Sequence, residues 1–303
     1  MEAKIRLRDM QIVRTAKVFR VLGTIGYSRR LIEGIERTRS GAAIFRWMLG
    51  YRRSFRTLDE AERAVRPYAK GGHEHPVNSA LQFELNQFEL NRVAKPSDYA
   101  AFYYLRDRIP CIKKIFDMGG NVGNLYYRYR DYLPLRPDAI WTVYDLPDNI
   151  LRGRALASEK NVDNLQFTDD LQQAEGLDLL IVSGALHYFD RPLPEFIENI
   201  KQRPKYILIN RSPLTEGPEF AVVQDYAGMI RVACKVYNRS KLVADFKRLS
   251  YEVLGEWQAA ELGLTVVDRP SSSVGAYTGL WLEQLQPDME GDVHERTSTR
   301  EAR

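Results

Sequence analysis

A glycine-rich turn, Asp117-Met-Gly-Gly-Asn-Val-Gly123, carries the first residues of this chain that could do chemistry. An apolar segment with Ile115 and Phe116 leads into the acid, and a helical segment is expected from Leu125 to Leu133. Glycine permits positive φ angles and a close backbone approach to a ligand. The first N–H groups of a helix are unpaired and face the same space. Strand, acid, glycine turn and helix therefore predict one half of a nucleotide-type binding unit.

The spacing of the glycines narrows the class of ligand. A dinucleotide-binding fingerprint requires G-x-G-x-x-G directly after a strand. From Gly119 the turn reads Gly-Gly-Asn-Val-Gly, which does not fit that fingerprint. The spacing therefore counts against a nicotinamide-dependent enzyme.

Polar residues also follow the other predicted strands. After Pro110 strands and helices alternate, which predicts a parallel sheet. Such sheets bind ligands at the carboxyl ends of their strands. Asp145 ends one strand and lies 22 residues beyond Gly123, a spacing that suits an acid pairing with ribose hydroxyls. The predicted strands are 113–117, 140–145, 165–168, 179–183, 206–210, 251–257 and 276–282. The residues at their ends include Asp117, Asp145, Asp169, Asp170, Ser183, Gly184, His187, Asn210 and Arg211.

Residues 111–284 resemble class I S-adenosylmethionine-dependent methyltransferases. The first motif of that family is an acid, one residue and then G-x-G-x-G; Asp117, Gly119 and Gly123 match it, and Asn121 replaces the middle glycine. Asparagine tolerates left-handed backbone conformations, so the turn can survive this replacement. Three later segments resemble the second motif, the adenine-side acid motif and the fourth motif: Thr142–Pro147, Phe167–Asp170 and Asp178–Tyr188.

The resemblance implies an α/β Rossmann-like fold with a mostly parallel seven-stranded sheet, whose last strand is an antiparallel insertion. It implies S-adenosyl-L-methionine as cofactor, with Asp145 on the ribose and Leu146 against the adenine. The implied cofactor-binding residues are Asp117, Gly119, Gly120, Asn121, Gly123, Asp145, Leu146, Asp169, Asp170, Ser183 and Gly184. No metal is expected.

Four shorter segments are similar to a narrower family of methyltransferases associated with bacterial surface-polysaccharide gene clusters. This resemblance implies O-methylation of a sugar or of a glycolipid or polysaccharide intermediate. The segments are 119–127, 185–188, 209–213 and 236–240.

Methyl transfer to a neutral hydroxyl needs the acceptor held in line and its proton removed. His187 is predicted to be the base, and the alternative is a surface or packing histidine beside Tyr188. Arg211 is predicted to hold an anionic acceptor, and the alternative is a salt bridge at the strand end. Tyr126 and Tyr127 could line the pocket, although Tyr126 fits a core position better.

Residues 1–110 are predicted to form a mostly helical subdomain that closes over the ligand or binds the substrate. Thr57 opens a capping box for a helix reaching Tyr68, and Ser97 is expected to cap another helix. The methyltransferase domain follows over residues 111–285, and residues 286–303 form a polar tail expected to be disordered. His73 and His75 are interpreted as part of a polar loop rather than a metal site, and Asp190 as a helix cap.

The N-terminal part of the chain is basic. Residues 1–70 hold 17 Lys and Arg against 7 Asp and Glu, a net charge of +10, so the remaining residues sum to −6. Residues 1–27 can contact an anionic membrane surface, or RNA in an RNA methyltransferase, or form an ordinary solvated surface. A non-catalytic cofactor-binding module is a further alternative.

The bulk composition fits a soluble globular protein, with 44% hydrophobic and 28% charged residues. Two cysteines, Cys111 and Cys234, make a disulfide framework improbable. No signal peptide or membrane-spanning run is recognised, so a cytoplasmic location is expected. Neither the acceptor nor the oligomeric state follows from the sequence.

Overall fold

The computed structural model describes residues 54–65, 94–226, 230–264, 266 and 272–285, together with positions 31, 34, 35, 38 and 40. The side chains of residues 224–231 are not described. The basic arm 1–27, the His73–His75 loop and the tail 286–303 all lie outside these residues.

The centre of the structure is a seven-stranded sheet with the order β10-β11-β6-β5-β2-β3-β4. Neighbouring strands from β4 to β6 run parallel, whereas β11 is antiparallel to both β6 and β10. This topology confirms the predicted Rossmann-like class I methyltransferase fold with an antiparallel last strand. The strands are β2 (Lys114–Met118), β3 (Ile140–Tyr144), β4 (Leu165–Thr168), β5 (Leu179–Ser183), β6 (Tyr206–Ser212), β10 (Tyr251–Ala259) and β11 (Tyr277–Gln284).

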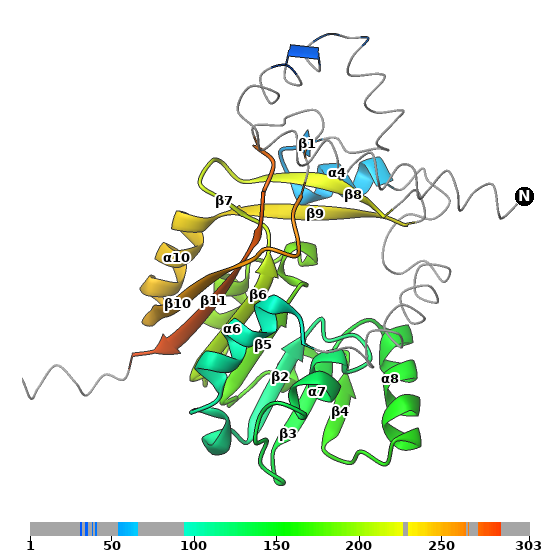
Figure 1. The fold of residues 1–303 in the computed structure, drawn as a ribbon, viewed down its shortest axis with the longest axis vertical. Coiled ribbons are helices and arrows are strands. Elements are labelled where there is room, and N and C mark those ends of the chain that lie inside the picture. The colour runs from blue at the N-terminus through cyan, green and yellow to red at the C-terminus, as the bar shows by residue number, and fades with distance from the viewer. Residues whose placement is uncertain are drawn as a thin grey trace, which may run out of the picture.

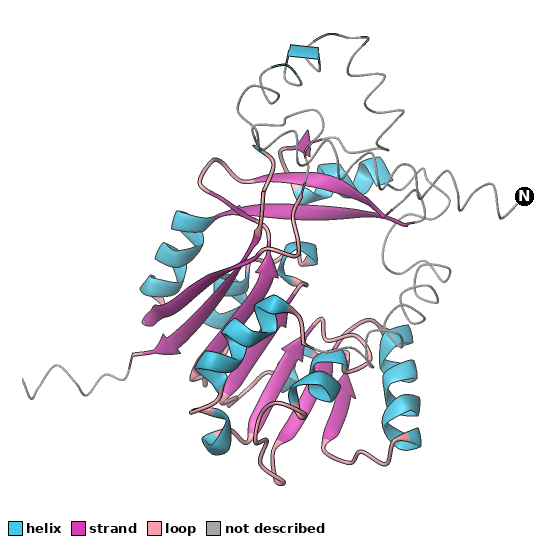
Figure 2. Cartoon of the chain, viewed as in Figure 1, coloured by secondary structure: helices cyan, strands magenta, loops and turns pink. Residues whose placement is uncertain are grey.

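Helices cover both faces of this sheet (Figure 2). Successive strand residues point to opposite faces, so Ile115 joins one hydrophobic core and Phe116 the other. The first core also takes residues from α6 (Pro96–Leu105), α7 (Asn124–Tyr129) and α8 (Pro147–Glu159). The second takes residues from η3 (Leu186–Tyr188), α9 (Leu193–Glu198) and α10 (Arg239–Arg248). Strand β5 is buried on both sides, which explains its unbroken apolar sequence.

A second, four-stranded sheet has the order β1-β8-β9-β7. It comprises β1 (Ser54–Phe55), β7 (Leu214–Thr215), β8 (Phe220–Tyr226) and β9 (Ile230–Asn238), and α4 (Leu58–Val65) packs on β8 and β9. Figure 1 shows β8 and β9 lying across the carboxyl ends of β5 and β6, and Tyr237 of β9 donates a hydrogen bond to the Leu186 carbonyl at 3.3 Å.

The sequence prediction contained no strand between Asn210 and Arg239, and this was wrong. The signal was present, because β9 places Val232, Cys234 and Val236 at alternate positions and all three are buried. The missed strands matter for the site, since they bring a second layer to the carboxyl edge of the large sheet.

Helix starts were partly predicted. The cap at Thr57 is confirmed, because its Oγ1 accepts the Glu60 N–H at 3.2 Å. The return bond of the predicted capping box is displaced by one residue, since the Glu60 carboxylate accepts the N–H of Arg56 at 3.0 Å rather than that of Thr57. Ser97 does not cap α6. The N-cap is Lys95, because Pro96 takes the first helical position, where a missing N–H costs nothing.

Two local predictions around the helices need correction. Helix α7 ends at Tyr129 rather than at Leu133, and Arg128 on this helix is buried. Asp190 is not the cap of α9, whose N-cap is Pro192. Helix α6 packs against β6, β10 and β11, so it covers the large sheet although it lies before residue 110. Among the described helices, none is both long and apolar enough to cross a membrane.

Candidate functional site

The glycine turn after β2 has the backbone that a close ligand approach requires. Gly119, Asn121 and Gly123 have φ angles of 78°, 56° and 90°, so the asparagine takes the left-handed conformation expected of it. A Cβ on Gly119 would collide with Ala185, and one on Gly120 with the Asp117 carboxylate. The turn therefore lies directly on the end of β2 and against the segment after β5.

Asp117 is the next-to-last residue of β2 and is 1% exposed. Its Oδ2 accepts the Trp141 indole N–H at 3.2 Å, while its Oδ1 is buried and has no hydrogen-bond partner in the described part of the chain. Burial raises the pKa of Asp117 to about 7; the Trp141 hydrogen bond opposes this rise and the nearby Asp145 adds to it. Oδ1 of Asp117 can therefore accept a hydrogen bond from a ligand donor or contact a cation.

Asp145 follows β3 and is bound to the glycine turn. Its Oδ2 accepts the Asn121 N–H at 2.8 Å, and its Oδ1 accepts the Leu146 N–H at 2.8 Å and the Asn149 Nδ2 at 2.6 Å. Burial raises the pKa of Asp145, and these three hydrogen bonds oppose that rise. The first and second motifs therefore meet in one hydrogen-bonded unit.

Sequence reasoning missed Asn149, which lies in the first turn of α8, four residues after Asp145. Its Nδ2 fixes Asp145, and its Oδ1 is buried without a partner among the described residues, as is Oδ1 of Asn124 at the start of α7. With Oδ1 of Asp117, three unsatisfied acceptors surround the glycine turn. Buried acceptors of this kind require donors, and a ligand can supply them.

The two acids after β4 are placed differently from Asp145. Asp169 and Asp170 are exposed, and the Asp170 carboxylate accepts the Gln172 N–H at 2.9 Å as the N-cap of η2 (Leu171–Gln173). Leu146 is partly exposed and forms the N-cap of α8. These residues line the same edge of the sheet, and their predicted contacts with adenine stay predictions.

Ser183 and Gly184 end β5 beside the switch point of the sheet, where β5 neighbours β2. Gly184 has a φ of 71°, and its N–H donates to the Asn210 carbonyl at 2.8 Å. The Ser183 hydroxyl accepts a hydrogen bond from Nη1 of Arg211 at 3.3 Å. The end of β5 is thus bonded to the end of β6.

His187 is only 2% exposed. Its ring lies 4.0 Å from the Tyr188 ring and 5.8 Å from the Tyr277 ring, between centroids, and the hydrophobic cluster of the small sheet contains Tyr277 with Tyr188 packed against it. This placement corresponds to the packing alternative, and the role of base stays a prediction.

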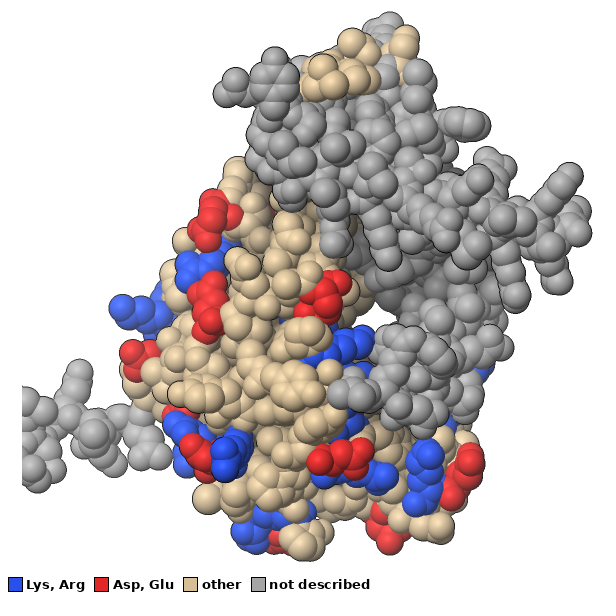
Figure 3. Space-filling model, viewed as in Figure 1, with Lys and Arg blue, Asp and Glu red and all other residues tan. Residues whose placement is uncertain are grey.

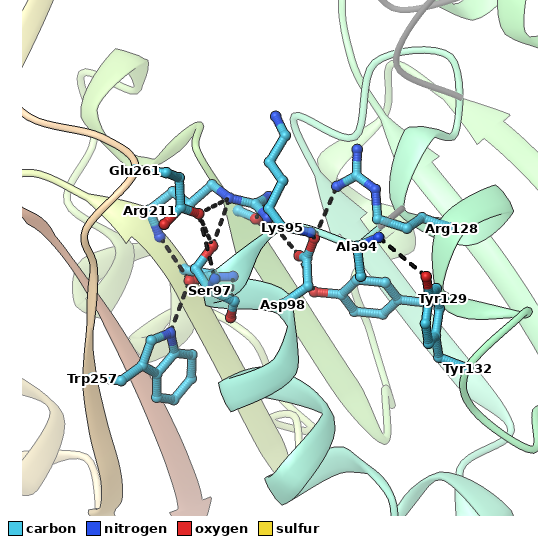
Figure 4. Close-up of polar contacts among 12 residues, drawn as sticks. Ala94, Lys95, Ser97, Asp98, Arg128, Tyr129, Tyr132, Arg211, Trp257 and Glu261 are labelled. Atoms are coloured by element: carbon cyan, nitrogen blue, oxygen red, sulfur yellow. Dashed lines mark hydrogen bonds and ion pairs between the residues drawn. The ribbon is translucent and has the colours of Figure 1, made fainter. Parts of the chain in front are cut away.

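Arg211 is the next-to-last residue of β6 and has a φ of 54°, beside a register shift in the β6–β11 pairing. Its side chain is buried and reaches Ser97, Asp98, Ser183 and Glu261 (Figure 4). These contacts occupy the guanidinium, which corresponds to the alternative of a salt bridge at the strand end.

Asp98 is the acid that binds Arg211, and sequence reasoning missed it. It is 0% exposed, and its Oδ2 accepts the Lys95 N–H at 2.8 Å, which completes the start of α6. The signal was an acid three residues after the N-cap. Tyr126 is buried as expected and donates to Oδ1 of Asn164 at 2.7 Å, and Tyr127 is buried beside it.

Comparisons with known proteins give distant likenesses. No family model and no curated protein matches the chain. The mitomycin 7-O-methyltransferase MmcR is similar in structure, with 16% identity, a TM-score of 0.45 and coverage of 70% of this chain and 59% of that one. The glycopeptide N-methyltransferase MtfA, complexed with S-adenosyl-L-methionine, has 11% identity, a TM-score of 0.44 and coverage of 64% and 95%.

A SAM-dependent methyltransferase from Aquifex aeolicus has 12% identity, a TM-score of 0.42 and coverage of 68% and 98%. The chain spans about three fifths of the length of the mitomycin enzyme. The assignment of the fold rests on the strand order of the large sheet, β10-β11-β6-β5-β2-β3-β4, with β11 antiparallel.

Proposed function

We propose that this chain is an S-adenosylmethionine-dependent methyltransferase. The observation that carries the proposal is the hydrogen bond between Asn121 and Asp145, which joins the glycine turn to the acid of the next strand. This unit lies at the carboxyl edge of the sheet and next to its switch point, where open α/β sheets bind ligands.

The residues present fit this cofactor. Asp145 would hold the ribose hydroxyls, and the free oxygens of Asp117, Asn124 and Asn149 would accept from donor groups of the ligand. Neither Asp117 nor Asp145 has a Lys or Arg ion-pair partner among the described residues. When ionised, these carboxylates therefore suit a cationic ligand. The cofactor would supply an activated methyl group on a sulfonium centre, and the chain would bind and orient it.

We infer that the acceptor is a hydroxyl on a sugar or on a glycolipid or polysaccharide intermediate. The inference rests on the narrower sequence resemblance. Two of the segments in that resemblance lie next to each other in the sheet. Residues 185–188 follow β5 and residues 209–213 include the end of β6, and these parallel strands pair through Ser183 and Asn210. His187 is proposed as the base for that hydroxyl.

Turnover tests the proposed reaction. The purified chain with labelled S-adenosylmethionine is expected to methylate at least one member of a panel of nucleotide sugars and glycolipids. His187→Gln should lower that turnover by about 100-fold or more, the contribution typical of a general base, and leave cofactor affinity unchanged. Unchanged turnover in this variant would remove His187 as the base.

A non-catalytic cofactor-binding module is the second candidate. It is favoured by the burial of both predicted catalytic residues, since His187 and Arg211 are 2% and 6% exposed. Cofactor binding without turnover on any acceptor of the panel would support this module over the enzyme.

The basic arm 1–27 is proposed to contact an anionic membrane surface, with RNA as the alternative partner. The face of the described residues in Figure 3 intermixes acidic and basic side chains. Binding of the full chain to phosphatidylserine vesicles, lost on deletion of residues 1–27, is expected. Salt-dependent RNA binding that is lost on the same deletion would favour RNA instead.

A further inference from the structure

A buried ionic cluster connects the two sides of the switch point. Asp98 lies between two arginines: its Oδ2 is 3.1 Å from Nη1 of Arg128, and its Oδ1 is 2.6 Å from Nη2 of Arg211. The three side chains are at most 8% exposed. Tyr129 also donates its hydroxyl to Asp98 at 3.1 Å. One carboxylate therefore holds two cations away from water (Figure 4).

The two arginines come from opposite halves of the candidate site. Arg128 belongs to α7, which begins directly after the glycine turn on β2. Arg211 is the next-to-last residue of β6, and its Nη1 donates to Ser183 at the end of β5. Strands β2 and β5 are neighbours at the switch point. Asp98 thus bridges the glycine-turn half, β2 with α7, to the β5–β6 half.

The backbone conformation of Arg211 indicates that neighbouring residues fix its side chain against Asp98. A non-glycine residue with a φ of 54° is strained, and such residues persist where neighbouring contacts determine them. Arg211 has those contacts, because Nε donates to Ser97 at 2.9 Å and its own N–H donates to the Asn210 side chain at 3.0 Å. The side chain is therefore aimed at the start of α6.

We propose that Asp98 is a positioning residue that holds the two halves of the candidate cofactor site together across the switch point. The identity of the ligand rests on the proposed function, whereas the contacts of Asp98 with Arg128 and Arg211 do not depend on that function. Loss of the charge of Asp98 removes the carboxylate that contacts both buried guanidiniums and leaves Arg211 with Glu261, whose Oε1 lies 3.6 Å from its Nε. Removing one partner of a buried ion pair is strongly destabilising, because the remaining charge stays buried. The glycine turn and the end of β5 then lose their fixed spacing.

The test compares Asp98→Asn with Asp178→Asn. Asparagine at residue 98 keeps the size and one acceptor oxygen but removes the charge. Asp178 is a matched control, because its carboxylate accepts the Lys113 and Lys114 N–H groups at 2.8 Å and 3.0 Å, at the opposite edge of the same strands. Amide hydrogen exchange is measured over residues 119–129 and 183–188, with S-adenosylhomocysteine affinity by calorimetry, at a temperature where circular dichroism shows folded protein.

Asp98→Asn should speed exchange in both segments by at least tenfold and weaken S-adenosylhomocysteine binding by at least tenfold, whereas Asp178→Asn should change neither. A folded Asp98→Asn variant with exchange and affinity within twofold of wild type overturns the proposal. If wild type binds no S-adenosylhomocysteine, the proposed function fails and exchange alone decides the positioning role.

Arg211→Gln covers the case in which Asp98→Asn does not fold. This variant leaves the Asp98–Arg128 pair in place, so faster exchange should be confined to residues 183–188. Unchanged exchange there, or equal acceleration over residues 119–129, contradicts the proposed bridge.

Discussion

The backbone N–H of Asn121 donates to Oδ2 of Asp145 at 2.8 Å, which ties the turn after β2 to the acid after β3. The other carboxylate oxygen of Asp145 is held by Leu146 and Asn149. Asp145 therefore shapes the glycine turn before any ligand arrives. A change at Asp145 should affect the turn and the ligand together.

Gly120→Ala should destabilise the protein by about 1–3 kcal/mol, the usual cost of overpacking. The added Cβ would meet the Asp117 carboxylate, which the core holds in place. Urea unfolding measures the change. Gly275→Ala is the control, because a Cβ there meets nothing within 4 Å, and it should shift stability by no more than about 0.5 kcal/mol. Equal effects in the two variants would contradict the packing described for Gly120.

The raised pKa of Asp117 predicts that the free energy of unfolding decreases as the pH rises. Its pKa is about 7 in the folded chain and near 4 in the unfolded chain, so the folded chain binds more protons between these values. The unfolding free energy should then decrease from about pH 4 to pH 7, by up to roughly 4 kcal/mol, and not change further from Asp117 above pH 7. Asp117→Asn should remove this slope. Parallel pH profiles for the two proteins would disprove the assignment.

The same carboxyl group should make cofactor affinity depend on pH. S-adenosylmethionine carries a sulfonium charge that S-adenosylhomocysteine lacks, and an ionised Asp117 attracts that charge. The preference for S-adenosylmethionine should therefore increase as the pH rises through about 7. Calorimetry with both ligands at pH 6 and pH 8 measures it, and a ratio of affinities that does not change, or one that changes equally in Asp117→Asn, would count against this role.

Thr57→Ala should lower the unfolding free energy by about 1 kcal/mol, the typical value of an N-cap. Its Oγ1 accepts the Glu60 N–H, and α4 packs on the small sheet through Leu58, Ala61 and Val65. Urea unfolding of this variant is compared with that of Asp59→Ala, whose exposed side chain forms an ion pair within the helix with Arg63. A loss no larger than that of Asp59→Ala would show that the cap contributes little.

The large sheet could be predicted because its signals are local. Leu179–Ser183 is an unbroken apolar run that ends at a polar residue, and the glycine turn marks the end of β2. The left-handed Asn121 follows from the known tolerance of asparagine. Such features depend on a few neighbouring residues, so they can be identified from the sequence without knowledge of the tertiary contacts.

The polar cluster could not be predicted, because it joins residues far apart in the sequence. Asp98, Arg128 and Arg211 lie on α6, α7 and β6. Asp98 and Arg128 each alone suggest a solvated charge, and the salt bridge considered for Arg211 had no partner that the sequence identifies. Only the packing of α6 over the sheet brings them together. The burial of His187 depends on the same kind of long-range packing, since the small sheet and Tyr277 bury it, so the sequence left the base and the surface or packing alternative both open.

Calorimetry of S-adenosylmethionine and S-adenosylhomocysteine with wild type and Asp145→Ala tests the central claim most directly. Asp138→Ala is the control, because Asp138 precedes β3 as Asp145 follows it and is exposed. Wild type should bind both compounds, Asp145→Ala should weaken both by more than tenfold, and Asp138→Ala should bind within twofold of wild type. Wild type that binds neither compound, or Asp145→Ala that binds as tightly as wild type, would contradict the account.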